Sequence, residues 1–267
     1  IIELMHENKI YQMPILDNES NIIDIAEVDE KLSVETSNTI VVLMAGGKGK
    51  RLRPYTESCP KPMLHIGGEP ILEILLKQYL SFGFNNFYIS VNYLKEQISS
   101  HFQNGEKWEV KIDYLIENEP LGTAGSLTLL PEGIKKPFIV MNGDILTRLE
   151  PTKLLEYHSK HKADATMCVR SHTHTIPYGV VETESIDIIR FEEKPKRIVS
   201  VNAGIYVIEP KLLDIMEGSA YIDMPTFLMQ AKEKGFRIIV FPIHEYWIDV
   251  GRPETLIEAN ESWDISF

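Results

Sequence analysis

The strongest structural signal in this chain is the stretch VVLMAGGKGKRLRPYTESCPKP, residues 41–62. It opens within an apolar, β-branched run at residues 40–44, which is the pattern of a buried strand. The run breaks into Gly46, Gly47 and Gly49, whose backbone N–H groups can approach a ligand closely. The basic residues of the stretch are Lys48, Lys50, Arg51, Arg53 and Lys61. In a chain of net charge −12, this concentration of cations predicts a strand followed by a loop that holds polyanions.

The residues of this stretch exclude two common phosphate-binding motifs. A Walker loop requires serine or threonine after Gly-Lys, whereas Gly49 and Lys50 are followed by Arg51. The dinucleotide fingerprint requires a third glycine, which would fall on Leu52. A glycine-rich turn with a solvated basic tip remains as the purely structural alternative.

Composition restricts the class of protein. With 267 residues and 43% apolar content, the chain can bury one large core, or one domain plus a fragment. No run approaches the ~18 apolar residues of a membrane span, and no signal peptide is visible, so we expect a cytoplasmic protein without membrane contact. Cys59 and Cys168 form neither a disulfide framework nor a metal-like cluster. No basic stripe lies outside the loop, which argues against nucleic-acid binding.

Beyond the loop, helical and strand patterns alternate. Pro70 and Gly83 bracket one expected helix, and residues 95–102 form another. The expected strands are residues 87–91, 110–116 and 138–141. This order predicts an α/β, Rossmann-like fold with a mixed, mainly parallel sheet and helices on both faces. Ligands of such sheets lie at the carboxyl ends of strands, where the glycine loop and residues 142–144 would meet.

The second half of the chain has strand patterns with short connections. They cover residues 163–170, 178–182, 188–192 and 203–208. We expect these strands to pair antiparallel beside the main sheet, as a small antiparallel subdomain on one side of a cleft. Residues 253–263 have the pattern of a final helix.

The letters from residue 45 to residue 64 resemble the signature of the sugar-1-phosphate nucleotidylyltransferases, the enzymes that make nucleotide sugars. Members carry Gly-Gly-x-Gly-x-Arg-Leu, then a proline and a threonine, then Pro-Lys-Pro. The matching residues are Gly46, Gly47, Gly49, Arg51, Leu52, Pro54, Thr56, Pro60, Lys61 and Pro62. Lys50 departs from the pattern, which usually has a small residue there. The resemblance implies a nucleotide-diphospho-sugar transferase fold over residues 36–267.

The resemblance also implies the reaction and its catalytic residues. A nucleoside triphosphate and a sugar 1-phosphate would give a nucleotide sugar and pyrophosphate, with Mg²⁺ as cofactor. The implied catalytic residues are Arg51, Lys61, Asp144 and Asp249. Asp144 and Asp249 each follow an apolar run, and within the family's Asn-Gly-Asp and Trp-Ile-Asp-Val-Gly segments they would be the metal ligands. Without the resemblance, each aspartate would be read first as a turn residue or helix cap.

The same resemblance also implies which residues bind the nucleotide. The implied residues are Ala45, Gly46, Gly47, Gly49, Lys50, Glu117, Gly122, Thr123 and Asn142. Glu117 occupies the position that faces the base, and a carboxylate offers only acceptors. It therefore matches the adjacent N1–H and N2–H₂ donors of guanine better than uracil or thymine, whose single donor lies between carbonyl oxygens. We expect GTP, unless Glu117 pairs with a neighbouring side chain.

By the same resemblance, the sugar phosphate would be bound by the expected antiparallel subdomain, which would form the sugar side of the cleft. The implied residues are Gly179, Glu193, Lys194, Asn202 and Gly204. Residues 192–194 on their own read as a solvated charge run. The sugar stays open among mannose, hexosamine, heptose and glucose phosphates.

Two alternative functions stay open. One is a uridylyl- or thymidylyltransferase that acts on glucose 1-phosphate. The other is a catalytically inactive, nucleotide-sensing regulatory protein, because a fold alone never proves activity. Self-association into a homo-oligomer is compatible with either.

Residues 1–35 are interpreted as a separate segment. Short strands at residues 13–17 and 21–26 flank a polar turn at residues 18–21, behind an apolar start at residues 1–5. This looks like the last half of a CBS regulatory module, followed by a linker at residues 34–39; a plain hairpin extension is the alternative. The chain begins with Ile, so we expect the rest of the module to be missing from it. Only intact modules would bind an adenine nucleotide.

Overall fold

The computed structural model describes residues 12–16, 22–27, 36–216 and 221–263. The chain divides into two compact units, Ile1–Glu35 and Thr36–Phe267, which are described separately. In the first unit, β1 (Gln12–Leu16) and β2 (Ile22–Glu27) pair antiparallel, as the sequence predicts. The predicted turn at residues 18–21, the apolar start at residues 1–5 and the beginning of the linker lie outside the described residues. The CBS interpretation stays a prediction.

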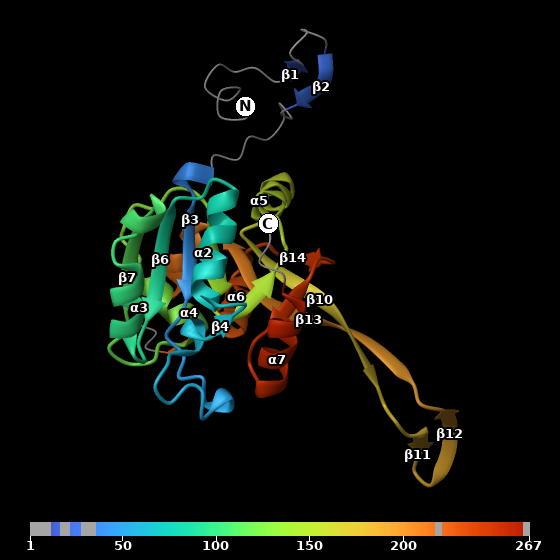
Figure 1. Cartoon of the computed structure of the whole chain (residues 1–267). Coiled ribbons are helices and arrows are strands. Elements are labelled where there is room, and N and C mark those ends of the chain that lie inside the picture. The colour runs from blue at the N-terminus through green and yellow to red at the C-terminus, as the bar shows by residue number, and fades with distance from the viewer. Residues whose placement is uncertain (1–11, 17–21, 28–35, 217–220, 264–267) are drawn as a thin grey trace. The chain divides into compact units, whose positions relative to one another are not determined.

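The second unit is built on a seven-stranded sheet of order β14-β10-β13-β8-β3-β6-β7 (Figure 1). Its strands are β3 (Ile40–Met44), β6 (Asn86–Val91), β7 (Lys111–Ile116), β8 (Phe138–Asn142), β10 (Ala165–Thr175), β13 (Lys196–Ile208) and β14 (Ile238–Ile243). Only β13 runs against its neighbours, β8 and β10, among these strands; the other pairings are parallel. The predicted mixed, mainly parallel sheet is confirmed.

Helices cover both faces of this sheet. The α-helices are α2 (Ile71–Ser81), α3 (Lys95–Phe102), α4 (Gly122–Gly125), α5 (Pro151–Lys160), α6 (Met224–Glu233) and α7 (Pro253–Ser262). On one face, Tyr79 of α2 meets the ring of Phe87 edge-on and donates a hydrogen bond to the sulfur of Met141. On the other face, Phe227 of α6 belongs to a buried cluster with Val42 of β3. Because alternate residues of a strand face opposite sides, both faces of the sheet are buried.

Short elements connect these layers. The 3₁₀ turns are Thr36–Asn38, Lys50–Leu52, Lys61–Met63, Glu106–Trp108, Ser126–Leu129 and Pro210–Met216. The short strand pairs are β4 (His65–Ile66) with β5 (Glu69–Pro70), and β9 (Ile145–Thr147) with β15 (Trp247–Asp249). The helix expected from Pro70 begins one residue later, because Pro70 is extended and caps it. No helix among the described residues is long and apolar enough to cross a membrane.

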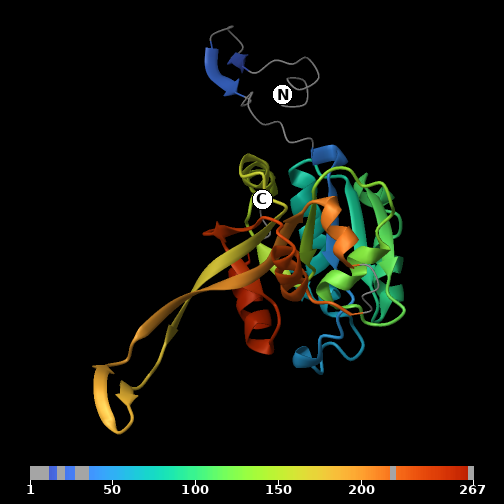
Figure 2. The ribbon, with the colours of Figure 1, turned by 180° about the vertical axis from the view of Figure 1, so that it is seen from behind.

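The second half of the unit differs from its prediction in one respect. β10 and β13 pair antiparallel as expected, but they continue the main sheet, because Ile205 of β13 pairs directly with Met141 of β8. Their outer halves run past the rest of the unit and end in a hairpin of β11 (Val180–Glu184) and β12 (Asp187–Glu192) (Figures 1 and 2). We call residues 171–200 the arm. The expected subdomain is therefore a two-stranded extension without a layer of its own.

Candidate active site

The glycine loop connects β3 to the 3₁₀ turn Lys50–Leu52. The N–H group of Ala45 donates to the carbonyl of Ser90 over 2.9 Å, which ties the start of the loop to β6. Gly49 has a φ of 58°, in the left-handed region, and its carbonyl accepts a 2.8 Å hydrogen bond from the Thr56 hydroxyl. Leu52 is fully buried, whereas the side chains of Lys50 and Arg51 are exposed. These hydrogen bonds anchor the loop backbone, while the side chains of Lys50 and Arg51 extend into solvent.

Three of the four predicted catalytic residues meet at the carboxyl end of the sheet. Lys61 is only 8% exposed; its ammonium forms an ion pair with Asp144 and lies 3.7 Å from Oδ1 of Asp249. Arg51 is close enough for its charge to act on Asp249 and oppose the rise of that carboxyl's pKa. The structure therefore gathers three of these residues around one point and leaves Arg51 within electrostatic reach of Asp249.

The two aspartates are brought together by the short strands β9 and β15. In their antiparallel register Asp249 faces Ile145, the residue after Asp144. The N–H group of Val250 then donates to the carbonyl of Asp144 over 2.9 Å. The backbone pairing thus fixes the backbone positions of Asp144 and Asp249 beside each other, although the two residues are distant in the sequence.

The local electrostatics disfavour a charged Asp249. Burial raises the pKa of its carboxyl and the Asp144 charge adds to this, while Lys61 and Arg51 act in the opposite direction. Its Oδ1 is buried and accepts no hydrogen bond from the described residues. A cation between the carboxylates would relieve this imbalance, and the Lys61 ammonium partly does so.

The same carboxylates fit a magnesium ion only together with substrate. Within the described ranges, no group of three or more His, Cys, Asp or Glu side chains could hold a metal. Mg²⁺ is commonly bound by one or two carboxylates plus substrate phosphates and water. Asp144 and Asp249 meet that requirement, and their role as metal ligands stays a prediction.

A cleft of about 290 Å³ opens beside these residues. It is lined by Met44, Gly46, Gly47, Glu117, Pro120, Gly122, Thr123, Asn142, Asp144, Tyr221 and Asp223. Most of this lining was predicted for the nucleotide. The lining residues that were not predicted are Met44, Pro120, Tyr221 and Asp223, although Asp223 precedes Met224 and Pro225 as a helix-cap signal would.

Glu117 has partners inside the protein. It is 7% exposed, and its carboxylate accepts hydrogen bonds from the Ser90 hydroxyl at 2.5 Å and from the Leu121 N–H group at 2.9 Å. A Cβ on Gly46 would lie 2.7 Å from Glu117 Oε1, so the carboxylate also lies against the glycine loop. The structure thus holds Glu117 in one orientation at the cleft wall; its role in base selection stays a prediction.

The predicted sugar-phosphate residues fall into two groups, and the first lies beside the cleft. Gly204 has a φ of 72°, and a Cβ there would lie 2.7 Å from Nδ2 of Asn142. Asn202 accepts a hydrogen bond from the Gly204 N–H group at 3.0 Å and donates one to the Tyr206 hydroxyl at 2.6 Å. Asn202 and Gly204 therefore lie near a cleft-lining residue, and their role in binding the sugar phosphate stays a prediction.

The second group lies on the arm and is not brought to the cleft of its own chain. Gly179 and Glu193 are neighbours there, since a Cβ on Gly179 would lie 3.0 Å from Glu193 Oε2. Gly179, Glu193 and Lys194 are all exposed, and none of them lines the cleft. The reason is the course of β10 and β13, which carry this segment away from the sheet (Figure 2).

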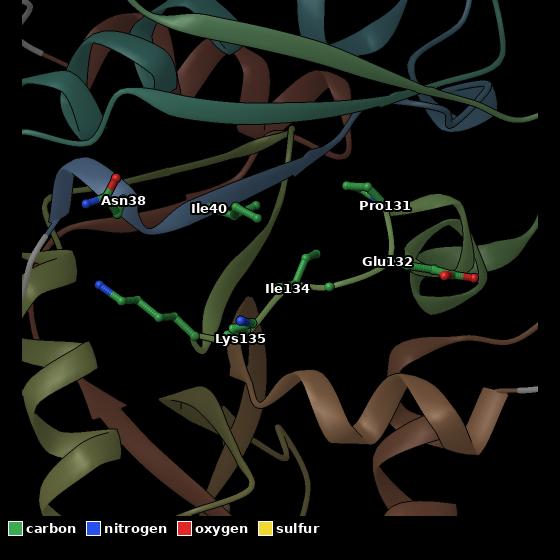
Figure 3. Close-up of a pocket in the computed structure, with 8 residues that line it drawn as sticks. Asn38, Ile40, Pro131, Glu132, Ile134 and Lys135 are labelled. Carbon is green, nitrogen blue, oxygen red and sulfur yellow. The ribbon is translucent and has the colours of Figure 1, made fainter.

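A larger cavity, of about 470 Å³, lies at the other end of β3 (Figure 3). It is lined by Asn38, Ile40, Pro131, Glu132, Gly133, Ile134, Lys135 and Lys136. None of these residues was predicted to bind substrate. Ligands of open α/β sheets bind at the carboxyl ends of strands, whereas Ile40 starts β3. The smaller cleft is therefore the candidate active site.

The chain is similar to known proteins over most of its length. The profile of the nucleotidyl transferase family matches residues 40–264. A mannose-1-phosphate guanyltransferase from Pichia angusta is 34% identical over 228 residues, which cover 82% of this chain and 62% of that protein. Mannose-1-phosphate guanylyltransferase 1 from Arabidopsis thaliana is 34% identical over 226 residues, 81% of this chain and 62% of its own length. The chain thus spans less than two thirds of these relatives.

A solved structure provides the third comparison. HddC from Yersinia pseudotuberculosis, complexed with GMP-PN, aligns with a TM-score of 0.65 and 26% identity over 85% of this chain and all of that one. The family match begins at residue 40 and gives no support to a CBS module before it. Since the match covers most of the second unit, the chain belongs to the nucleotidyl transferase family.

Proposed function

We propose that this chain transfers a guanylyl group from GTP to a sugar 1-phosphate, giving a GDP-sugar and pyrophosphate, with mannose 1-phosphate as the first sugar to test. The meeting of Lys61, Asp144 and Asp249 beside a glycine-lined cleft carries the proposal. The relatives named for mannose-1-phosphate guanylyl transfer support the substrates, and the neighbour that binds GMP-PN supports the nucleotide.

The reaction requires alignment and charge neutralisation. A phosphate oxygen of the sugar 1-phosphate attacks the α-phosphorus of GTP, the new P–O bond forms, and the bond to the β-phosphate oxygen breaks. Pyrophosphate leaves with that electron pair. The attacking oxygen is already anionic, so no general base is needed. The protein must hold two mutually repelling polyanions in line.

The residues divide this work. Arg51 would grip the β- and γ-phosphates with its fork of donors, because its side chain is exposed at the loop. Lys61 would stabilise the charge that develops on the α-phosphate. Its ammonium is held by Asp144 and Asp249, so it is oriented before substrate arrives. Bound Mg²⁺, with these two aspartates as ligands, would supply further neutralisation of phosphate charge.

Base selection is assigned to Glu117. Its carboxylate oxygens already accept bonds from Ser90 and Leu121, but each oxygen can accept a second one. Held in this way, the carboxylate is oriented to accept from the N1–H and N2–H₂ groups of guanine. The hydrogen bonds from Ser90 and Leu121 would thus hold the Glu117 carboxylate in the orientation that guanine requires.

Pyrophosphate release tests the proposal directly. The full chain is incubated with Mg²⁺, each of GTP, UTP, dTTP, ATP and CTP, and a panel of mannose, glucose, hexosamine and heptose 1-phosphates. We expect the fastest release with GTP, and its loss when a chelator removes the metal. A preference for UTP or dTTP with glucose 1-phosphate would instead support the alternative transferase. Silence across the panel, with GTP still bound, would support a regulatory protein.

Lys61→Ala is the first variant to make. We expect turnover to fall about a hundredfold or more, the order seen on removing one donor of transition-state charge stabilisation. Lys135→Ala, a lysine at the opposite end of β3, is the matched control and should keep wild-type turnover. Near-wild-type turnover in Lys61→Ala would remove Lys61 from the catalytic residues.

A further inference from the structure

The arm is a two-stranded ribbon almost without burial. Its strands pair from Ser171 with Ser200 to Thr175 with Lys196, and the β11–β12 hairpin follows. Within residues 171–200 only Pro195 is buried. Both views show the ribbon running out past the helices and the sheet (Figures 1 and 2). Isolated two-stranded ribbons are marginally stable in water at best, so the arm needs a partner.

The arm is also the most apolar exposed segment of the unit. Of the seventeen exposed large hydrophobic residues in the described part of the chain, eight lie on it. They are Tyr178, Val181, Ile186, Ile188, Ile189, Phe191, Ile198 and Val199. Single exposed apolar residues are ordinary, but eight on one two-stranded ribbon point to an interaction surface. The arm therefore has the composition of a segment that packs against another surface.

Charge on the arm complements the cleft. Lys194, Lys196 and Arg197 place three cations within four residues. The described residues that line the cleft include three carboxylates, Glu117, Asp144 and Asp223, and no lysine or arginine. Lys61 and Arg51, which lie beside this lining, are assigned to the nucleotide in the proposed function, so the cations of the arm remain available for the phosphate of the second substrate.

The backbone at Lys194 is itself unusual. Its φ of 43° is rare for a residue with a side chain, and more so before a proline such as Pro195. Strain of this kind clusters at functional positions, where surrounding structure enforces it. Five other non-glycine residues among those described also have a positive φ, so this conformation points to Lys194 only together with its exposure and its charge.

The direction of the arm decides which cleft it can serve. β10 is parallel to β8 and β3, so the arm leaves the sheet at its carboxyl end, the same end as the cleft. It then runs out past the helices and the sheet (Figure 2), and no residue of the arm lines the cleft of its own chain. Two copies that face each other with these ends can exchange arms reciprocally, which gives a closed two-fold dimer.

We propose that the arm of one copy of this chain inserts beside the cleft of a second copy and supplies Lys194 and Glu193 to its sugar 1-phosphate. This inference rests on the proposed function. Lys194 pairs with the sugar phosphate, Glu193 accepts from sugar hydroxyls, and the apolar residues of the arm are buried against the second copy. Each active site is then composite, with the nucleotide half from one chain and part of the sugar half from the other.

Complementation between two inactive variants tests the exchange. Lys61→Ala damages the nucleotide half and should lose about a hundredfold or more of turnover. Lys194→Ala damages the arm and should lose about tenfold or more of kcat/KM. After co-expression, half of the dimers pair one chain of each kind, and one of their two sites has an intact cleft and an intact arm. We expect recovery to about one quarter of wild-type turnover per chain, as this symmetry requires.

A control co-expression and the activity of wild type separate failure of the arm exchange from failure of the proposed function. A chain carrying both K61A and K194A, co-expressed with Lys194→Ala, should recover nothing, because no intact arm is present. No recovery with the informative pair, while wild type is active, would show that the arm serves its own chain and would overturn this inference alone. A wild-type chain without activity on the whole panel would overturn the proposed function, and the inference with it.

Sedimentation provides a readout that does not depend on activity. We expect wild type to be dimeric, and the double variant Ile189→Ser with Phe191→Ser, on the arm, to be monomeric. Met229→Ser removes an equally exposed apolar side chain from α6 and should leave the dimer intact. A monomeric wild type with full turnover would overturn the inference.

Discussion

Asp249 shows, at the scale of one residue, how a site can oppose the stability of its own fold. Burial and the neighbouring Asp144 raise the pKa of its carboxyl above the ordinary value that it has in the unfolded chain. Ionised Asp249 therefore costs the folded state free energy at any pH above that ordinary value. The cost is full once the pH exceeds the raised pKa, and it disappears in acid.

Asp249→Asn should separate stability from activity. We expect a higher melting temperature than wild type at neutral pH, a difference that shrinks as the pH falls through the raised pKa, and strongly reduced pyrophosphate release. Thermal unfolding at several pH values, beside turnover, measures both effects. Asp214→Asn, an exposed aspartate, is the control. Equal or lower stability of Asp249→Asn at neutral pH would contradict the electrostatic account.

Neighbouring glycines of the loop differ in the room around them. A Cβ on Gly46 would lie 2.7 Å from Oε1 of Glu117, whereas one on Gly47 would meet nothing within 4 Å. We expect Gly46→Ala to lose about 1–3 kcal/mol of unfolding free energy, the usual cost of overpacking, and Gly47→Ala to lose little. Denaturant unfolding of the two variants measures this. If Gly46→Ala loses as little unfolding free energy as Gly47→Ala, the Glu117 side chain moves aside at little cost.

At the scale of elements, the link between α4 and α6 shapes the cleft wall. The hydroxyl oxygen of Thr123 accepts a 2.8 Å hydrogen bond from the N–H group of Met224, the first residue of α6. Asp223 accepts in return from the N–H group of Thr123 at 3.3 Å. The pair acts as a capping arrangement shared by two distant segments. Both side chains also line the cleft, so the cap and the site depend on each other.

Thr123→Val keeps the shape of the side chain and removes this cap. We expect a loss of about 1 kcal/mol of unfolding free energy, the typical value of a helix cap, together with weaker binding of GTP. Thr128→Val is the matched control, because the Thr128 hydroxyl donates only to the carbonyl of Gly125 at the surface. Calorimetric binding and denaturant unfolding are the measurements. Unchanged stability in Thr123→Val would show that water replaces the hydroxyl at no cost.

Elements with strong local patterns could be predicted closely. β3 and α3 have the predicted bounds, and the predicted strands of the parallel part are displaced by a residue at most. α5, α6 and β14 were not predicted, although Pro151 and Pro225 stand in first turns, as helix starts often have them. The position of β13 could not be predicted, since pairing between distant strands depends on which neighbour lies beside them, and no local pattern encodes that.

At the scale of the whole chain, the division into two units leads to a deletion experiment. Because residues 1–35 form a unit of their own, we expect the chain from residue 36 onward to keep the melting temperature and the turnover of the full chain. Calorimetry and pyrophosphate release compare the two. A clear loss of turnover after deletion would show that the first unit takes part in the activity. An adenine nucleotide should change neither chain, since only intact CBS modules are expected to bind one.

The chemistry and the local structure of the nucleotide half follow from short segments of the sequence. The run into Gly46, Gly47 and Gly49 specifies a strand and an open loop wherever it folds, because these are local backbone preferences. Tertiary structure alone decided which groups meet. It placed Asp144 beside Asp249 through the pairing of β9 with β15, and it separated Lys194 from the cleft of its own chain. Such distances depend on strand pairing and direction, which act between segments far apart in the chain.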